Sequence, residues 1–392
     1  MILEIAFAAT LCTGRVTDKN SYPTVPLPKP TVGQTIIDPV FGTKITRISA
    51  PLGTGANAIV KPLYSTMPAW NADETKLIIW HREVGYAIHS GQPPYAFDHM
   101  ATFDAPTDIE QLFWDPWNPD VIYYPSNRNA LPRLMRYNLS TKTNTLHMNL
   151  ASHCPSGDWG KLLTLGSDPS GPSFMLPGIK VIGMKCGSTL LTVNLDYLVA
   201  LPRSGINTPL AIAFAPFGQV GQISGYAFDF FSNPLRWLSL PNPFEHGSVG
   251  ASTKAVNVWN SVRFDGGDPA SLVSTNLDTG VSKVIIGIAN GWPYPPSGTH
   301  VSSITRNLGW AAVSSVGNPN FDGPLNQEIY LGNTDTGEVC RVGHHRSWAG
   351  EGKWGYWAEP HLVISPSGTK ILFGSDWGNG PSVDVYVLDL GS

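Results

Sequence analysis

Short apolar runs separated by polar turns recur along the chain. Near the C-terminus, residues 359–376 comprise an apolar run, the polar turn Ser365-Pro-Ser-Gly and a second apolar run. Residues 65–82 repeat this arrangement, with Lys76-Leu-Ile at the position of Lys370-Ile-Leu. Further copies lie at 110–125, 246–261 and 300–315. Two apolar runs around a polar turn are typical of a β-hairpin, so each copy predicts one hairpin.

A second pattern follows these copies. Two strand-like runs flank a tight turn at Asn138, Asn276 and Asn333, and more weakly at Asn194; the turns at 276 and 333 contain Asp-Thr-Gly. This is the pattern of an outer hairpin. An inner and an outer hairpin together make a four-stranded blade of a β-propeller.

The number of repeats predicts an all-β fold, a seven-bladed β-propeller with blades of four antiparallel strands. Five blades are clear, and residues 150–242 have room for two more. The C-terminal copy has three strands, so we expect residues 43–49 to supply its outer strand and close the ring, which removes exposed edges. Residues 35–392 are then a single domain, and residues 1–34 an N-terminal extension.

Composition narrows the class of protein. Charged residues make up 14% of the chain, with 40 Gly and 34 Pro, which excludes a disordered chain or a coiled coil. The net charge of −4 gives no basic field for nucleic acid, so none is expected. The apolar run from Ile2 to Cys12 is too short to span a membrane and is either a signal remnant or a strand. We expect a secreted, extracellular monomer, in which the four cysteines could form disulfides of unassigned pairing.

Histidines occupy one position in three successive repeats. Aligned innermost strands place His246, His300 and His361 at the start of the strand, with Gln111 at the same position in another repeat. The starts of the innermost strands share one face of a propeller, here called the top face, at the mouth of the central channel. Converging imidazoles predict a site for a divalent metal ion (Mn, Zn or Ca), with Gln111 as a further oxygen ligand. The alternative is that these rings bond to backbone or water.

Other polar residues are predicted on the same face. In the first blade, His81 ends the second strand; a long loop with Tyr86 and His89 follows, and His99 opens the third strand. Removal of the proton α to a uronate carboxylate needs a base, a group that neutralises the carboxylate, and an acid. The catalytic candidates are His81 or His99 as base, Tyr124 as acid and Arg128 as neutraliser. Each could instead be structural.

Aromatic side chains and acids complete the predicted top face. Aromatic rings stack on sugars, so the substrate-binding candidates are Trp292, Tyr294, Trp354 and Trp357, although some could simply plug the channel mouth. Hydrolysis of a glycosidic bond needs two carboxylates across it. The predicted top-face acids, which form no recurring pair, are Glu83, Asp98, Glu245, Asp322 and Glu359.

These features resemble a known family. The segments 42–49, 70–77 and 361–373, with His at successive inner strands, are similar to the propeller polysaccharide lyases, which include oligogalacturonate, ulvan and rhamnose–glucuronate lyases. In oligogalacturonate lyase, His and Gln side chains hold a metal in the channel; the nearest matches here are His246, His300 and His361, with Gln111. That enzyme's closely spaced His pair has no counterpart. Ulvan lyases carry two His, then a Tyr and an Arg, an order echoed by His81, His99, Tyr124 and Arg128.

The resemblance implies a polysaccharide lyase that cleaves a uronic-acid-containing polysaccharide by β-elimination. Its partner would be an acidic polysaccharide or oligosaccharide. Two alternatives remain open from the sequence. One is a non-catalytic propeller that binds carbohydrate or protein, and the other is a propeller glycoside hydrolase.

Overall fold

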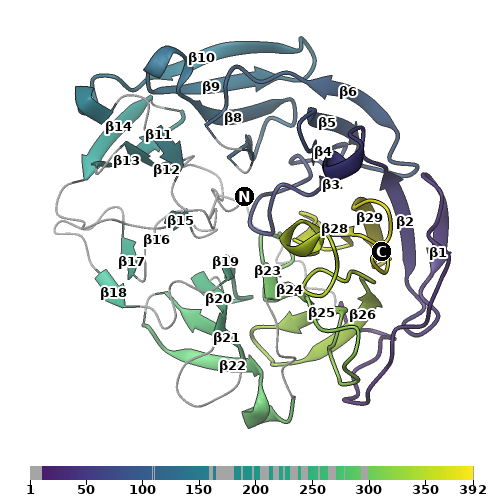
Figure 1. The fold of residues 1–392 in the computed structure, drawn as a ribbon. Helices are drawn as coiled ribbons and strands as arrows, with labels where there is room; N and C mark the ends of the chain where they lie inside the picture. Colours follow the sequence, from purple (N-terminus) through teal and green to yellow (C-terminus); the bar gives the residue numbers. More distant parts are fainter. Residues whose placement is uncertain are drawn as a thin grey trace.

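The structure is a computed structural model. It describes residues 11–107, 109, 111–158, 162–164, 181–186, 189–196, 198–203, 212–214, 220–223, 226–229, 237–239, 246–254, 257–263, 271–277, 279–292 and 299–391. The described strands form seven antiparallel sheets, six of four strands and one of five. Figure 1 shows these sheets arranged in chain order around a common centre.

Three four-stranded sheets lie within residues 60–203. The first comprises β3 (Val60–Lys61), β4 (Lys76–His81), β5 (Gly85–Ser90) and β6 (Phe97–Ala101). The second comprises β7 (Phe113–Trp114), β8 (Val121–Ser126), β9 (Arg133–Asn138) and β10 (Thr143–Asn149). The third comprises β11 (Leu162–Thr164), β12 (Val181–Cys186), β13 (Thr189–Asn194) and β14 (Val199–Arg203).

Three further four-stranded sheets follow. They are β15 (Ile212–Phe214), β16 (Val220–Ile223), β17 (Tyr226–Asp229) and β18 (Trp237–Ser239); then β19 (Gly247–Ala251), β20 (Asn257–Arg263), β21 (Ser271–Asn276) and β22 (Ser282–Ile286); then β23 (Thr299–Ser302), β24 (Trp310–Ser315), β25 (Glu328–Asn333) and β26 (Val339–His344). Short 3-10 helices lie at η1 (Gly55–Asn57), η2 (Arg128–Ala130), η3 (Ser156–Asp158), η4 (Ile288–Asn290) and η5 (Gly355–Ala358).

The last sheet joins the two ends of the chain. Its order is β1 (Thr35–Ile37), β2 (Lys44–Ser49), β29 (Asp384–Asp389), β28 (Lys370–Ser375) and β27 (Val363–Ile364). β2 pairs antiparallel with β29, in the outer position expected for residues 43–49. β1, which the repeat pattern did not predict, adds a fifth strand beyond β2.

Apolar side chains between neighbouring sheets form the core. One buried cluster combines Val60, Leu77 and Ile79 of the first sheet with Leu372 and Val387 of the last sheet. The first and last sheets therefore pack face to face. The prediction of an all-β propeller with antiparallel four-stranded blades is confirmed. The sequence left room for two more blades in residues 150–242. This range contains the sheets β11–β14 and β15–β18, of which the structure describes mainly the strands themselves.

One prediction about the first blade is wrong. Tyr86 and His89 lie in the strand β5 and not in a loop, and His99 lies in the outermost strand β6. The chain turns tightly between β4 and β5, with Glu83 at φ 58° and Gly85 at φ 120°. Tyr86, Ala87 and Ile88 are then buried between sheets, which explains why this apolar run forms a strand.

The described part of the N-terminal extension is fixed to the propeller. A disulfide joins Cys12 to Cys340 in β26, and a second joins Cys154 to Cys186, which settles the pairing that the sequence left open. Val16 forms a β-bridge with Arg341, whose buried guanidinium pairs with Glu328. Within the described residues, no helix has the length and apolar character needed to cross a bilayer.

Candidate functional site

Three histidines from three sheets meet where the innermost strands of these sheets begin. His246 directly precedes β19, His300 lies in β23, and His361 lies two residues before β27. The ring centroids of His246 and His300 are 4.5 Å apart, and those of His300 and His361 are 4.3 Å apart. Tyr64, from the connection between β3 and β4, packs against all three rings. The structure thus brings together the residues that the repeat alignment placed together.

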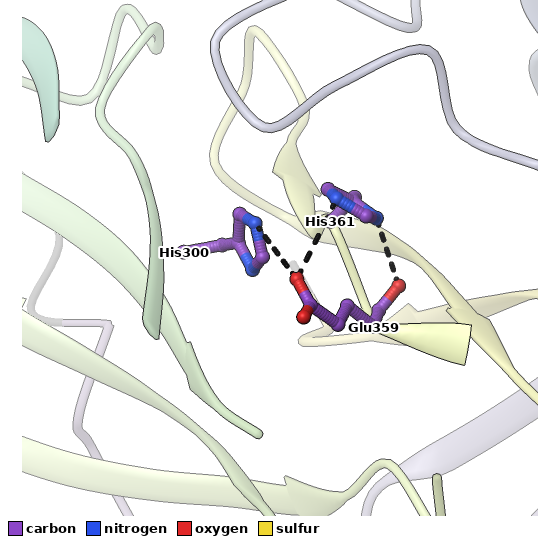
Figure 2. A group of neighbouring side chains, drawn as sticks. All are labelled: His300, Glu359 and His361. Carbon is purple, nitrogen blue, oxygen red and sulfur yellow. Dashed lines mark hydrogen bonds and ion pairs between the residues drawn. The ribbon is translucent and has the colours of Figure 1, made fainter. Parts of the chain in front are cut away.

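Glu359 joins two of these histidines, as Figure 2 shows. Its Oε2 lies 3.6 Å from Nε2 of His300 and 3.9 Å from Nε2 of His361. One ligand atom from each of the three residues lies within 4.8 Å of the others. Ligands of one ion at bonds of about 2.1 Å lie about 3–3.5 Å apart, so small side-chain shifts would complete such a site.

The backbone fixes the orientation of His361. Its ring Nδ1 lies 2.9 Å from the carbonyl oxygen of Glu359, to which it donates a hydrogen bond in the neutral tautomer. This leaves the lone pair of Nε2 directed toward the carboxylate. The residue has φ 41°, a left-handed conformation that costs energy for any residue except Gly and recurs at functional sites.

Burial keeps His300 and His361 neutral. Burial lowers the pKa of His300 well below its usual value, and the charges of His246 and Lys61 lower it further. Burial, followed by Lys61 and His300, does the same to the pKa of His361. Burial raises the pKa of Glu359, although His246 and Lys61 oppose the rise. Neutral imidazole is the form that ligates metals.

The hydrogen bonding of the histidine ring nitrogens indicates whether the site suits a cation. In the part of the chain that the structure describes, both ring nitrogens of His300 and Nε2 of His361 are buried without a hydrogen-bond partner. Such atoms are costly in a folded protein and call for a ligand. Two neutral imidazoles and a carboxylate are a donor set suited to a divalent transition ion. The residues present therefore fit a metal.

Two cations and several aromatic rings border the cluster. Lys61, at the end of β3, is fully buried, with Nζ 4.7 Å from the ring centroid of Tyr356 and 5.5 Å from that of Trp357. Trp357 also stacks on Trp80 at 5.7 Å, and the guanidinium carbon of Arg82 lies 4.7 Å from its centroid. Sequence reasoning missed Lys61 and Arg82 as functional groups.

The two histidines predicted as bases are not brought together. His81, at the end of β4, is buried, and its Nδ1 accepts a hydrogen bond from the Leu52 N–H at 3.2 Å. Burial, followed by His89, lowers the pKa of His81 to about 4. His99 lies in β6 with Nε2 3.2 Å from the Tyr137 hydroxyl, and the strand β5 separates it from β4.

Tyr124 and Arg128 meet at a different point, around Asp104. The buried Tyr124 hydroxyl donates to Oδ1 of Asn144 at 2.6 Å and accepts from the Asp104 N–H at 3.0 Å. Burial raises the pKa of Tyr124 to about 12. Arg128 Nε lies 2.5 Å from a carboxylate oxygen of Asp104, with Arg133 close behind. The charge of Arg128 is therefore already compensated within the protein.

Not all of the predicted sugar-binding aromatics lie together. Trp357 contacts Lys61 and Tyr356, and Tyr356 packs against His361. Trp354 packs against the same apolar cluster as Trp357, and its Nε1 donates to the Gly380 carbonyl at 3.0 Å. Trp292 is buried in another part of the core with Val301. Tyr294 lies outside the described residues. Gln111, the fourth predicted ligand, accepts a hydrogen bond from the Thr107 hydroxyl at 2.8 Å.

Glu359 is a metal-ligand candidate that the sequence analysis considered only as a hydrolytic acid. Its place two residues before His361 is the signal that could have marked it, because such spacing around an extended residue lets both side chains reach one point. For Lys61, the signal is a lysine at the end of an apolar innermost strand.

Fold and site together define a β-propeller with a His/Glu group near the start of its innermost strands, and two solved structures share this fold. An oligogalacturonate lyase in complex with manganese has a TM-score of 0.63 and 14% identity, over 96% of this chain and 99% of that protein. An oligogalacturonate lyase from Vibrio parahaemolyticus has a TM-score of 0.64 and 13% identity, over 92% and 96%. No protein-family model and no curated protein matches the sequence. The likeness confirms the resemblance to propeller lyases at the level of the fold.

Proposed function

We propose that this protein is a lyase that cleaves a uronate-containing oligosaccharide or polysaccharide by β-elimination at the channel mouth. The observation that carries the proposal is the group of His300, Glu359 and His361, with unsatisfied imidazole nitrogens beside a buried lysine. β-Elimination needs a base and positive charge at the carboxylate, and this site offers imidazoles and a lysine. The fold likeness to two oligogalacturonate lyases supports the same reaction.

We propose that His300, Glu359 and His361 hold a divalent metal ion. A bound ion would act as a Lewis acid that neutralises the uronate carboxylate and stabilises the enolate-like charge formed when the α-proton leaves. Manganese suits the mixed nitrogen and oxygen donors, and one of the similar structures is described as a manganese complex. Lys61 adds positive charge to the same region.

His246 is the base that the geometry favours. Its ring is half-buried, in contrast to the fully buried rings of His300 and His361, and stacks on His300 outside the His/Glu group. A half-buried imidazole next to the ligand group can reach a substrate proton. His81, His99, Tyr124 and Arg128 remain candidates from the sequence; in the structure their polar atoms contact Leu52, Tyr137, Asn144 and Asp104, respectively.

We also infer that the seven sheets are the seven blades of one closed ring spanning residues 35–392, with residues 1–34 as an extension. The pairing of β2 with β29 and the packing of the first sheet on the last support this. We propose that the protein is secreted and monomeric. The two disulfides support an oxidising compartment.

The test is the ultraviolet absorbance of unsaturated uronate products during incubation with a panel of uronate polymers. The wild-type protein should produce the absorbance rise, and His246→Ala and His361→Ala should each lower the rate by at least about a hundredfold, the usual contribution of an acid–base group. New reducing ends without absorbance would indicate a hydrolase. Binding without either product would indicate a carbohydrate-binding propeller.

A further inference from the structure

Arg82 occupies an unusual position on the top face. It follows His81 at the end of β4 and is half-buried. Its guanidinium carbon lies 4.7 Å from the ring centroid of Trp357, and Nζ of Lys61 lies 5.5 Å from the same centroid. Trp80 stacks on Trp357, and this contact fixes the indole ring that both Arg82 and Lys61 contact.

Among the described residues, Arg82 has no carboxylate partner. Across the described residues, no carboxylate forms an ion pair with its guanidinium, and its neighbour Glu83 is exposed. Two other arginines are compensated, since Arg128 pairs with Asp104 and Arg346 pairs with Asp38. An arginine fixed on an aromatic ring keeps its planar fork of donors free for a ligand.

The ligand can be identified by its chemistry. A guanidinium binds a carboxylate through two parallel hydrogen bonds, a geometry that a hydroxyl or an amide does not match. Arg82 is connected to the His/Glu group through one aromatic cluster, because Trp357 also contacts Lys61 and Tyr356 packs 4.8 Å from His361. Arg82 and the His/Glu group therefore border the same aromatic cluster.

We propose that Arg82, held on Trp357, forms a subsite for a second carboxylate of an anionic oligosaccharide whose first carboxylate lies at the His/Glu group. This inference rests on the proposed function and adds to it the binding of two charged sugars at once. The site selects oligosaccharides with uronates close together along the chain over those with isolated uronates.

Calorimetric titration tests the subsite, with trigalacturonate, its methyl ester and monomeric galacturonate as probes. The full chain loaded with Mn²⁺ is used in a His246→Ala background, so that cleavage does not interfere. Arg82→Met should weaken trigalacturonate binding about tenfold, the scale of a charge-assisted pair. Binding of the monomer should not change. Arg82→Lys, which keeps the charge and loses the fork, should give an intermediate affinity.

The matched control is Arg136→Met, which removes an exposed arginine from β9. It should bind every probe as the background protein does, and melting temperatures should confirm that all variants fold. Equal trigalacturonate affinity with and without Arg82 would overturn the subsite and leave the lyase proposal standing. A wild-type protein that neither binds nor cleaves any of these probes would overturn both.

Discussion

At the residue scale, burial decides the state of the ionisable groups. His300 and His361 are fully buried, and desolvation disfavours the imidazolium form. The same burial leaves three ring nitrogens without partners among the described residues. Each unsatisfied buried group costs about 1–3 kcal/mol, so the cluster is expected to be less stable empty than filled.

A bound divalent ion should therefore stabilise the fold. At a concentration one hundred times the dissociation constant, Mn²⁺ should raise the free energy of unfolding by about 2.7 kcal/mol. Differential scanning calorimetry with Mn²⁺ and with EDTA measures the shift. His361→Ala should abolish it, whereas His147→Gln, which changes a half-buried histidine in β10, should retain it. An equal shift in both variants would contradict the assignment of the ligands.

The low pKa of His81 should make stability depend on pH. Its pKa is about 4 in the folded protein, below the 6.5 of a free histidine, so the unfolded chain binds the proton more readily. The stability linked to this ring is complete above pH 6.5 and is lost as the pH falls toward 4. The slope is about 1.4 kcal/mol per pH unit.

His81→Asn tests this, since the Asn oxygen can still accept the Leu52 N–H and does not titrate. The variant should show a shallower loss of stability between pH 6.5 and 4 in urea unfolding. An identical pH slope in both proteins would show that other groups cause the loss.

At the element scale, the five-stranded sheet shows how local pattern and distant contact combine. β2 pairs with β29 and carries β1 on its outer side. The turn between β1 and β2 contains Asp38, whose carboxylate accepts the His344 N–H at 3.1 Å and pairs with Arg346 at 3.0 Å. Asp38 therefore connects the hairpin of β1 and β2 to the end of β26.

Asp38→Asn should destabilise the protein by about 3–5 kcal/mol, because it leaves the buried Arg346 without its counter-charge. Burial would raise the pKa of Asp38, but His344 and Arg346 outweigh it and hold the pKa well below its usual value. The stability it contributes is present above about pH 4 and is lost at lower pH. Chemical denaturation measures the change, and a loss below 1 kcal/mol would show that the pair matters little.

The hairpins were predictable because each one is encoded by neighbouring residues. The alternation of apolar run and polar turn identified the blades, and the repeat alignment brought His246, His300 and His361 together. The failures are tertiary in origin. His81 and His99 share a blade, but β5 separates their strands. Arg82 follows the first sheet, whereas Trp357 lies in the segment before β27 of the last sheet. Their stacking is a contact between distant parts of the sequence, so no local pattern encodes it.

At the scale of the whole molecule, one strand pairing and one disulfide join the N-terminal part of the chain to the C-terminal part. β2 completes the sheet of the C-terminal strands, and the Cys12–Cys340 disulfide spans 328 residues of sequence. The Cys154–Cys186 disulfide spans only 32 residues. In the chain-entropy account, a cross-link stabilises more when it closes a longer loop.

Replacement of both Cys12 and Cys340 by Ser should lower the free energy of unfolding by about 2–5 kcal/mol, and more than the same change at Cys154 and Cys186. Guanidinium unfolding of the two double variants provides the comparison. The opposite order would show that the short loop carries the greater strain or structure.

The central claim is a metal-assisted β-elimination at the channel mouth. Its most direct test is the ultraviolet absorbance of unsaturated uronate formed from oligogalacturonate by protein stripped of metal and then reloaded with Mn²⁺. The account predicts no rise in absorbance after stripping, a full rise after reloading, and no recovery for His361→Ala. Product formation that is unaffected by stripping and by His361→Ala would contradict it, as would the absence of unsaturated product from every uronate polymer tested.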